Sequence, residues 1–166
     1  MQFGTRTGFG LEFHLGRDPY LLCVDLFLGG LHLNARDNAF YPPLLVKKLK
    51  DELHRFRTPA PPPTGFASPA EAFRVAEDWT LDDPATGPAP EDGEEFASHR
   101  FLEWGGCTDD VLAFAFPYGD DLHLACRVHG DTGPRPSALV AVSRTALTGT
   151  LEESLAAAEH AWSLRR

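Results

Sequence analysis

Five side chains between residues 23 and 36 carry the groups best suited to chemistry in this sequence. They supply a thiol, a carboxylate, an imidazole, an amide and a guanidinium, on Cys23, Asp25, His32, Asn34 and Arg36. A thiol beside an imidazole and a carboxylate can act as a nucleophile with its base and orienting acid. The same groups on a sheet surface can instead form polar cross-strand pairs with no catalytic role.

A predicted β-hairpin positions these side chains. Two β-patterned runs, residues 20–28 and 31–36, are joined by Gly29 and Gly30, which can both take the positive φ of a two-residue turn. Period-2 alternation puts the apolar side chains on one face, expected to be a core: Leu22, Val24, Leu26, Leu28, Leu31, Leu33 and Ala35. The opposite face is polar, and we expect it to stay partly solvated.

The hairpin register favours binding over catalysis. It places Asp25 directly opposite Asn34 and diagonal to both His32 and Arg36, whereas Cys23 and His32 are not opposite each other. We therefore predict no catalytic residue. Asp25, His32, Asn34 and Arg36 form a first candidate partner-binding face, with a plain solvated sheet surface as its alternative.

A second candidate binding site surrounds the glycine pair Gly105-Gly106. Trp104 precedes it, and Asp109 and Asp110 follow. An aromatic ring beside carboxylates is a reasonable anchor for a basic protein surface. The alternative is that Trp104 fills the core.

The sequence carries no spacing typical of a metal or nucleotide site. His123 and His129 share a predicted strand face, but Arg127 lies between them, and a cation is a poor neighbour for a metal. His99 and Cys107 lack a supporting ligand motif, and no glycine-rich phosphate loop is present. We expect no metal and no cofactor.

Apolar periodicity predicts the remaining elements. Helices are expected from Pro42-Pro43, with a stripe of Leu45, Leu49, Leu53 and Phe56, and from a Thr150 cap, with a stripe of Leu151, Leu155, Ala158 and Trp162. Strands are expected over residues 7–15, 98–104, 111–116, 122–129 and 138–143. The fold class is α+β: antiparallel sheets with an amphipathic helix after the first three strands and a C-terminal helix packed on the sheet.

The middle of the chain joins the two halves. Residues 58–67 form a proline-rich connector, residues 68–79 favour a short helix over a strand, and residues 81–96 read as an acidic loop. We expect one domain over residues 1–166, since 166 residues suit one hydrophobic core better than two.

Composition and charge limit the classes of partner that this protein is expected to bind. A net charge of −9 disfavours binding to nucleic acid or to an anionic membrane, and suits a basic protein partner. No apolar run is long enough to span a bilayer and no secretory signal is visible, so we expect a cytoplasmic protein. The three widely spaced cysteines are expected to be free thiols.

The order of elements resembles the WapI family of bacterial immunity proteins. The segments that carry the resemblance are residues 20–27, 101–104, 111–116 and 122–128 and the helix with Leu151, Ala158 and Trp162. The resemblance implies a non-enzymatic cytoplasmic protein that neutralises a toxin, commonly a nuclease, by direct binding. The proline-rich insertion and the acidic loop depart from the family pattern, and no family binding residue is carried over. The alternative is a small enzyme or biosynthetic accessory protein that binds an organic ligand on the sheet face.

Overall fold

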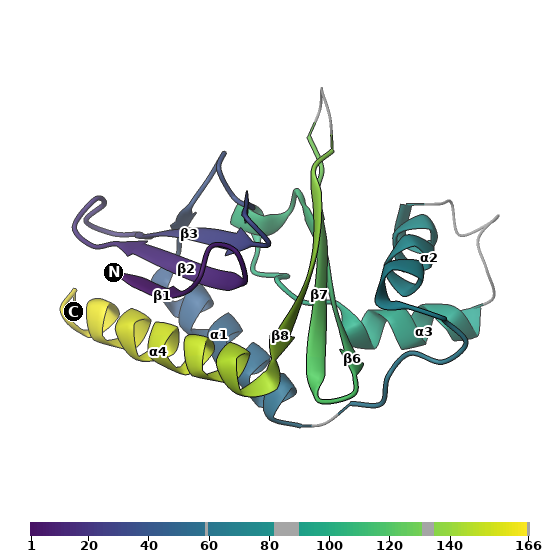
Figure 1. Ribbon diagram of the computed structural model, residues 1–166. Coiled ribbons are helices and arrows are strands. Elements are labelled where there is room, and N and C mark those ends of the chain that lie inside the picture. Colours follow the sequence, from purple (N-terminus) through teal and green to yellow (C-terminus); the bar gives the residue numbers. More distant parts are fainter. Residues whose placement is uncertain (59, 82–89, 131–134, 166) are drawn as a thin grey trace.

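The computed structural model describes residues 1–58, 60–81, 90–130 and 135–165, and it shows an α+β architecture in layers. A first antiparallel sheet lies over two long helices, and a second sheet stands between this half and two further helices (Figure 1). The predicted fold class is confirmed: the sheets are antiparallel and the C-terminal helix packs on the first of them.

The first sheet is built from short strands around one central strand. Its members are β1 (Gln2–Gly4), β2 (Phe9–His14), β3 (Leu22–Leu28), β4 (Leu31–His32) and β5 (Ala39–Phe40). The predicted turn is confirmed, because Leu28 pairs with Leu31 across Gly29 and Gly30, whose φ values are 57° and 87°. The second arm is shorter than predicted: β4 ends at His32, and β5 takes over the edge of β3 further on.

Two helices cover the apolar face of this sheet. They are α1 (Pro42–Arg57) and α4 (Arg144–Ser163), which lie side by side (Figure 1). The predicted stripe of α1 is buried in the main core together with the even-numbered residues of β3. The predicted start of the last helix is wrong: Ser143 caps it, accepting a hydrogen bond from the Ala146 N–H at 3.1 Å, and Thr150 lies inside.

The second sheet packs against apolar layers on both faces, although one face of its edge strand is exposed. It consists of β6 (Val111–Tyr118), β7 (Asp121–Val128) and β8 (Ser137–Ser143), so three predicted strands are confirmed. One face joins the main core. The other packs on α2 (Pro69–Leu81) and α3 (Pro90–His99) in a second apolar cluster of Ala72, Phe73, Ala76, Phe96, Leu112, Phe114, Phe116 and Ala125.

The helices that cover the second cluster test two predictions for the middle of the chain. The helix over residues 68–79 is present as α2, whereas part of the predicted acidic loop, residues 90–96, belongs to α3. Phe96 is 1% exposed and lies 5.4 Å from the Phe66 ring, which anchors α3 to the apolar layer. Residues 82–89 of the predicted loop lie outside the described residues.

The strand predicted over residues 98–104 is also wrong. Residues 98 and 99 end α3, and Arg100 makes a single bridge to Phe114. Leu102 has a φ of 60°, and its N–H donates to Glu52 Oε1 of α1 at 2.9 Å instead of to a neighbouring strand. The Glu52 carboxylate therefore accepts the hydrogen bond that a neighbouring strand would accept from Leu102 in a sheet. Among the described residues, no helix is long and apolar enough to cross a membrane.

Candidate functional site

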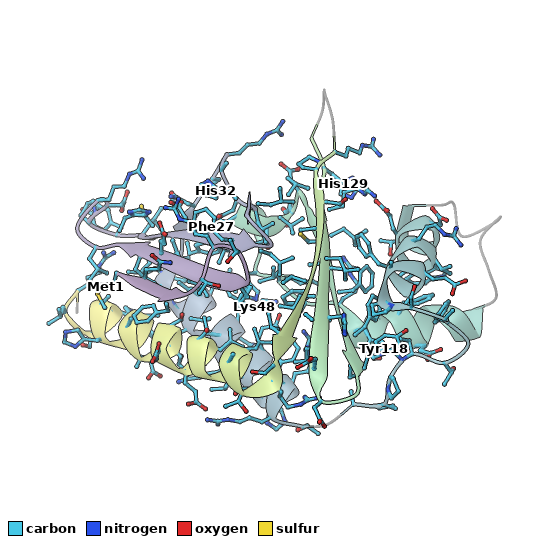
Figure 2. The ribbon with its side chains drawn as sticks, in the orientation of Figure 1. Met1, Phe27, His32, Lys48, Tyr118 and His129 are labelled. Carbon is cyan, nitrogen blue, oxygen red and sulfur yellow. The ribbon has the colours of Figure 1, made fainter. Side chains whose placement is uncertain are left out.

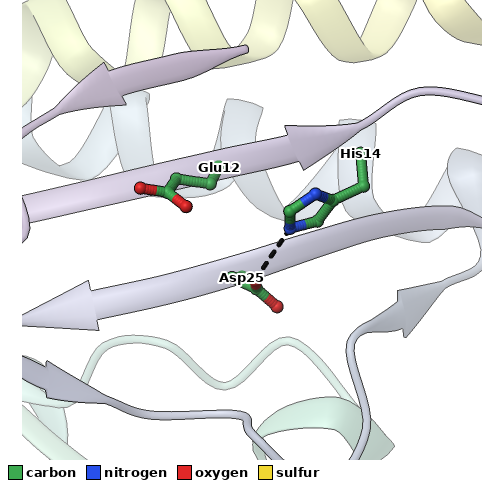
Figure 3. A group of neighbouring side chains, drawn as sticks. All are labelled: Glu12, His14 and Asp25. Atoms are coloured by element: carbon green, nitrogen blue, oxygen red, sulfur yellow. Dashed lines mark hydrogen bonds and ion pairs between the residues drawn. The ribbon is translucent and has the colours of Figure 1, made fainter.

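The outer face of the first sheet is organised around Asp25. Its Oδ2 lies 2.7 Å from His14 Nε2, and its Oδ1 accepts from Asn38 Nδ2 at 2.6 Å and lies 3.2 Å from His32 Nε2. Two imidazoles and an amide thus meet at one carboxylate. Glu12 lies beside His14 on β2, across from Asp25 (Figure 3).

Strand pairing brings these side chains together. Glu12 pairs with Asp25 between β2 and β3, and period-2 alternation puts His14 on the same outer face. The sequence pattern groups Glu12 with His14 on the polar side of the first predicted strand. It does not give the register between β2 and β3, so their contact with Asp25 was missed.

A cationic and aromatic rim borders this cluster. Arg6 holds Glu12 through two hydrogen bonds of 2.7 Å, from Nε and Nη2. The Arg6 guanidinium also lies 4.5 Å from the Phe27 ring centre, and the Phe27 ring stacks on His32 at 4.8 Å. The rim fixes the positions of Glu12 and His32.

Both carboxylates of the cluster are held ionised. Burial alone would raise the pKa of Asp25, but the hydrogen bonds from Asn38 and His14 and the charge of His32 outweigh it and lower that pKa. The Arg6 guanidinium lowers the pKa of Glu12 through its hydrogen bonds. The outer face therefore carries two negative charges at neutral pH, one of them paired with Arg6.

Asn34, predicted on this polar face, is a structural residue instead. It is 3% exposed, and its Oδ1 accepts from the Leu26 N–H while its Nδ2 donates to the Val24 carbonyl, both at 2.8 Å. The side-chain amide takes the place of a backbone amide along the edge of β3. The predicted Asp25–Asn34 side-chain pair is therefore wrong, since the Asn34 amide bonds the backbone of β3 instead.

A crevice of about 290 Å³ opens beside the outer face. The end of β4 and the loops beside the two sheets line it with His32, Arg36, Cys107, Asp110 and His129, among others. Arg36 Nη1 lies 3.3 Å from Asp110 Oδ2, which links the loop before β5 to the turn before β6. His32 and His129 stand on the same side of the molecule (Figure 2). The crevice thus brings together four predicted binding residues from the two candidate sites, His32, Asn34, Arg36 and Asp110.

Trp104 does not belong to this surface. It is 1% exposed and packs in the main core, with its Nε1 donating to Glu52 Oε1 at 3.3 Å. The core alternative for this residue is therefore confirmed. Asp109 is exposed but lines a separate hollow of about 330 Å³ with Lys48 and Glu103.

The three cysteines are free, and none is set up as a nucleophile. A nucleophilic thiol needs a lowered pKa. Burial instead raises the pKa of Cys23, and raises those of Cys107 and Cys126 to about 11. Raised pKa values disfavour thiolate chemistry at these three residues.

Comparison with known proteins shows a similarity in fold. No family description matches the sequence, and no curated protein is significantly similar to it. The crystal structure of CdiI from Burkholderia dolosa AUO158 has the same fold, with a TM-score of 0.60 and 15% sequence identity. The match covers 94% of this chain and 99% of that one. The chain therefore shares the whole fold of CdiI.

Proposed function

We propose that this protein is an immunity protein that neutralises a cognate toxin by direct binding, without catalysis. The observation that carries the proposal is the fold shared with CdiI, an immunity protein, over 94% of the chain. This likeness supports an immunity protein in general and does not single out the WapI family. The raised thiol pKa values of the cysteines agree with a binding role.

The binding surface in this proposal is the rim of the crevice together with the outer face of the first sheet. His32 belongs to both, and Arg36 and Asp110 stand exposed at the rim, with 61% and 51% of their side chains accessible. The net charge of −9 favours encounter with a basic toxin through electrostatic steering. We place the protein in the cytoplasm, where a toxin that enters or is made in the cell must be met.

The test is growth rescue. The chain is co-expressed with the product of each neighbouring gene, and we expect one neighbour to be toxic only when this chain is absent. The rescued pair should co-purify, and its association rate should fall as salt rises. Asp110→Lys should weaken the complex, whereas Asp120→Lys, at the exposed turn between β6 and β7, should not.

Two results would reject the proposal. One is that no neighbour is toxic, and the other is rescue without a physical complex. In either case the alternative of an organic ligand becomes the next hypothesis, and the crevice of about 290 Å³ is the place to screen.

A further inference from the structure

Four possible metal ligands converge on the outer face of the first sheet from three strands. Glu12 and His14 come from β2, Asp25 from β3 and His32 from β4. One ligand atom from each of Glu12, His14 and Asp25 lies within 4.8 Å of the others (Figure 3). This grouping is independent of any toxin, so the inference goes beyond the proposed function.

The spacing suits a tetrahedral ion. Because zinc–ligand bonds are about 2.0–2.2 Å long, neighbouring ligand atoms on a tetrahedral zinc are about 3.3 Å apart. Asp25 has one oxygen 2.7 Å from His14 Nε2 and the other 3.2 Å from His32 Nε2. These contacts lie near the tetrahedral spacing. The Glu12 carboxylate already belongs to the compact group with His14 and Asp25, and a side-chain rotation would bring in His32, which meets the second Asp25 oxygen.

The donor chemistry points to the same class of ion. Imidazole nitrogen with carboxylate oxygen suits zinc and its neighbours in the first transition row. We propose that His14, Asp25 and Glu12, with His32 as the fourth ligand, bind one divalent ion of the zinc type. Each histidine would use the lone pair of Nε2 and keep its proton on Nδ1, so the ion would replace the hydrogen bonds that now reach Asp25.

Arg6 sets the electrostatic balance of this site. Its guanidinium forms an ion pair with the Glu12 carboxylate. The Arg6 side chain is nevertheless 60% exposed and can turn away into solvent. With Arg6 in place, the cluster has a single uncompensated negative charge on its two carboxylates. An entering cation displaces Arg6 from Glu12, so Arg6→Gln should keep the site or tighten binding.

The test measures Zn²⁺ binding to the full chain by calorimetry in a buffer that does not chelate metals. We expect one ion per chain. His14→Gln and Asp25→Asn should each weaken binding at least ten-fold, because loss of even an outer-shell partner of a ligand costs that much. His160→Gln, on the exposed side of α4, is the matched control and should bind like the parent.

Stability and spectroscopy complete the test. Zn²⁺ should raise the melting temperature of the parent and of His160→Gln but not of His14→Gln. His14 is about one-third exposed, with 37% of its side chain accessible, so this variant should fold. Co²⁺ in place of Zn²⁺ should show tetrahedral ligand-field bands without thiolate charge transfer.

The proposal is overturned by binding that survives His14→Gln, by a thiolate spectrum, or by no binding to the parent. None of these results depends on the toxin.

Discussion

His99, at the end of α3, has its protonation state set by burial. It is 4% exposed, and its ring lies 5.5 Å from that of Phe116. Loss of hydration disfavours the charged imidazolium and lowers the pKa of His99. The unfolded chain, with a histidine pKa of about 6.5, therefore binds this proton more readily than the folded protein does.

The consequence is a stability that depends on pH. The contribution of neutral His99 is complete above about pH 6.5 and is lost as the pH falls toward the lower pKa of the folded state. We expect the free energy of unfolding, measured with urea, to be smaller at about pH 5.5 than at about pH 7.5. His99→Gln, which cannot be protonated, should lose part of this difference. An unchanged pH dependence in the variant would contradict the assignment.

At the scale of elements, the edge of β3 is completed by a side chain. β4 pairs with Phe27 and Leu28, and β5 pairs with Leu22 and Cys23, which leaves a gap between the two strands. The Asn34 amide fills this gap through its bonds to Val24 and Leu26 described above. Two short strands thereby act as one continuous edge.

Removal of this amide should cost about 2–4 kcal/mol of unfolding free energy, because an unsatisfied buried backbone group costs about 1–3 kcal/mol. Asn34→Ala tests this in a urea titration. Asn34→Asp is the matched variant: it keeps an acceptor for the Leu26 N–H but cannot donate to the Val24 carbonyl. We expect both variants to have a smaller free energy of unfolding than the parent. A loss below about 0.5 kcal/mol, typical of surface changes, would mean that the amide is not structural.

Local signals predicted most of the elements but not α3, placed a strand wrongly over residues 98–104, and located helix ends poorly. The Gly29-Gly30 turn and the stripe of α1 followed from glycine chemistry and helical spacing, which are local properties. The cap of α4 was placed at Thr150 because Glu153 follows it three residues later, as in a capping box. Ser143 caps the helix instead, and the Thr150 hydroxyl donates to the Ala146 carbonyl at 3.0 Å inside it.

At the scale of the whole molecule, the α+β class could be predicted but the composition of the site could not. The polar face of Asp25 was visible from alternation. Its neighbours Glu12 and His14 depend on the pairing of β2 with β3, which has no local signature. Trp104 was misplaced for the same reason: its environment is set by Glu52, which is 52 positions away in the sequence. Features set by local sequence patterns could therefore be predicted, whereas features set by contacts between distant residues could not.

The two apolar clusters on opposite faces of the second sheet differ in size, which implies that the parts of the fold they hold differ in their resistance to local unfolding. Among the described residues the cluster beneath α2 and α3 is the smaller, so we expect these helices to open in a partial unfolding more readily than β3 and α1. Amide hydrogen exchange would show this directly, with faster exchange across α2 and α3 than across β3 and α1. The fold would then have a less firmly held layer formed by α2 and α3.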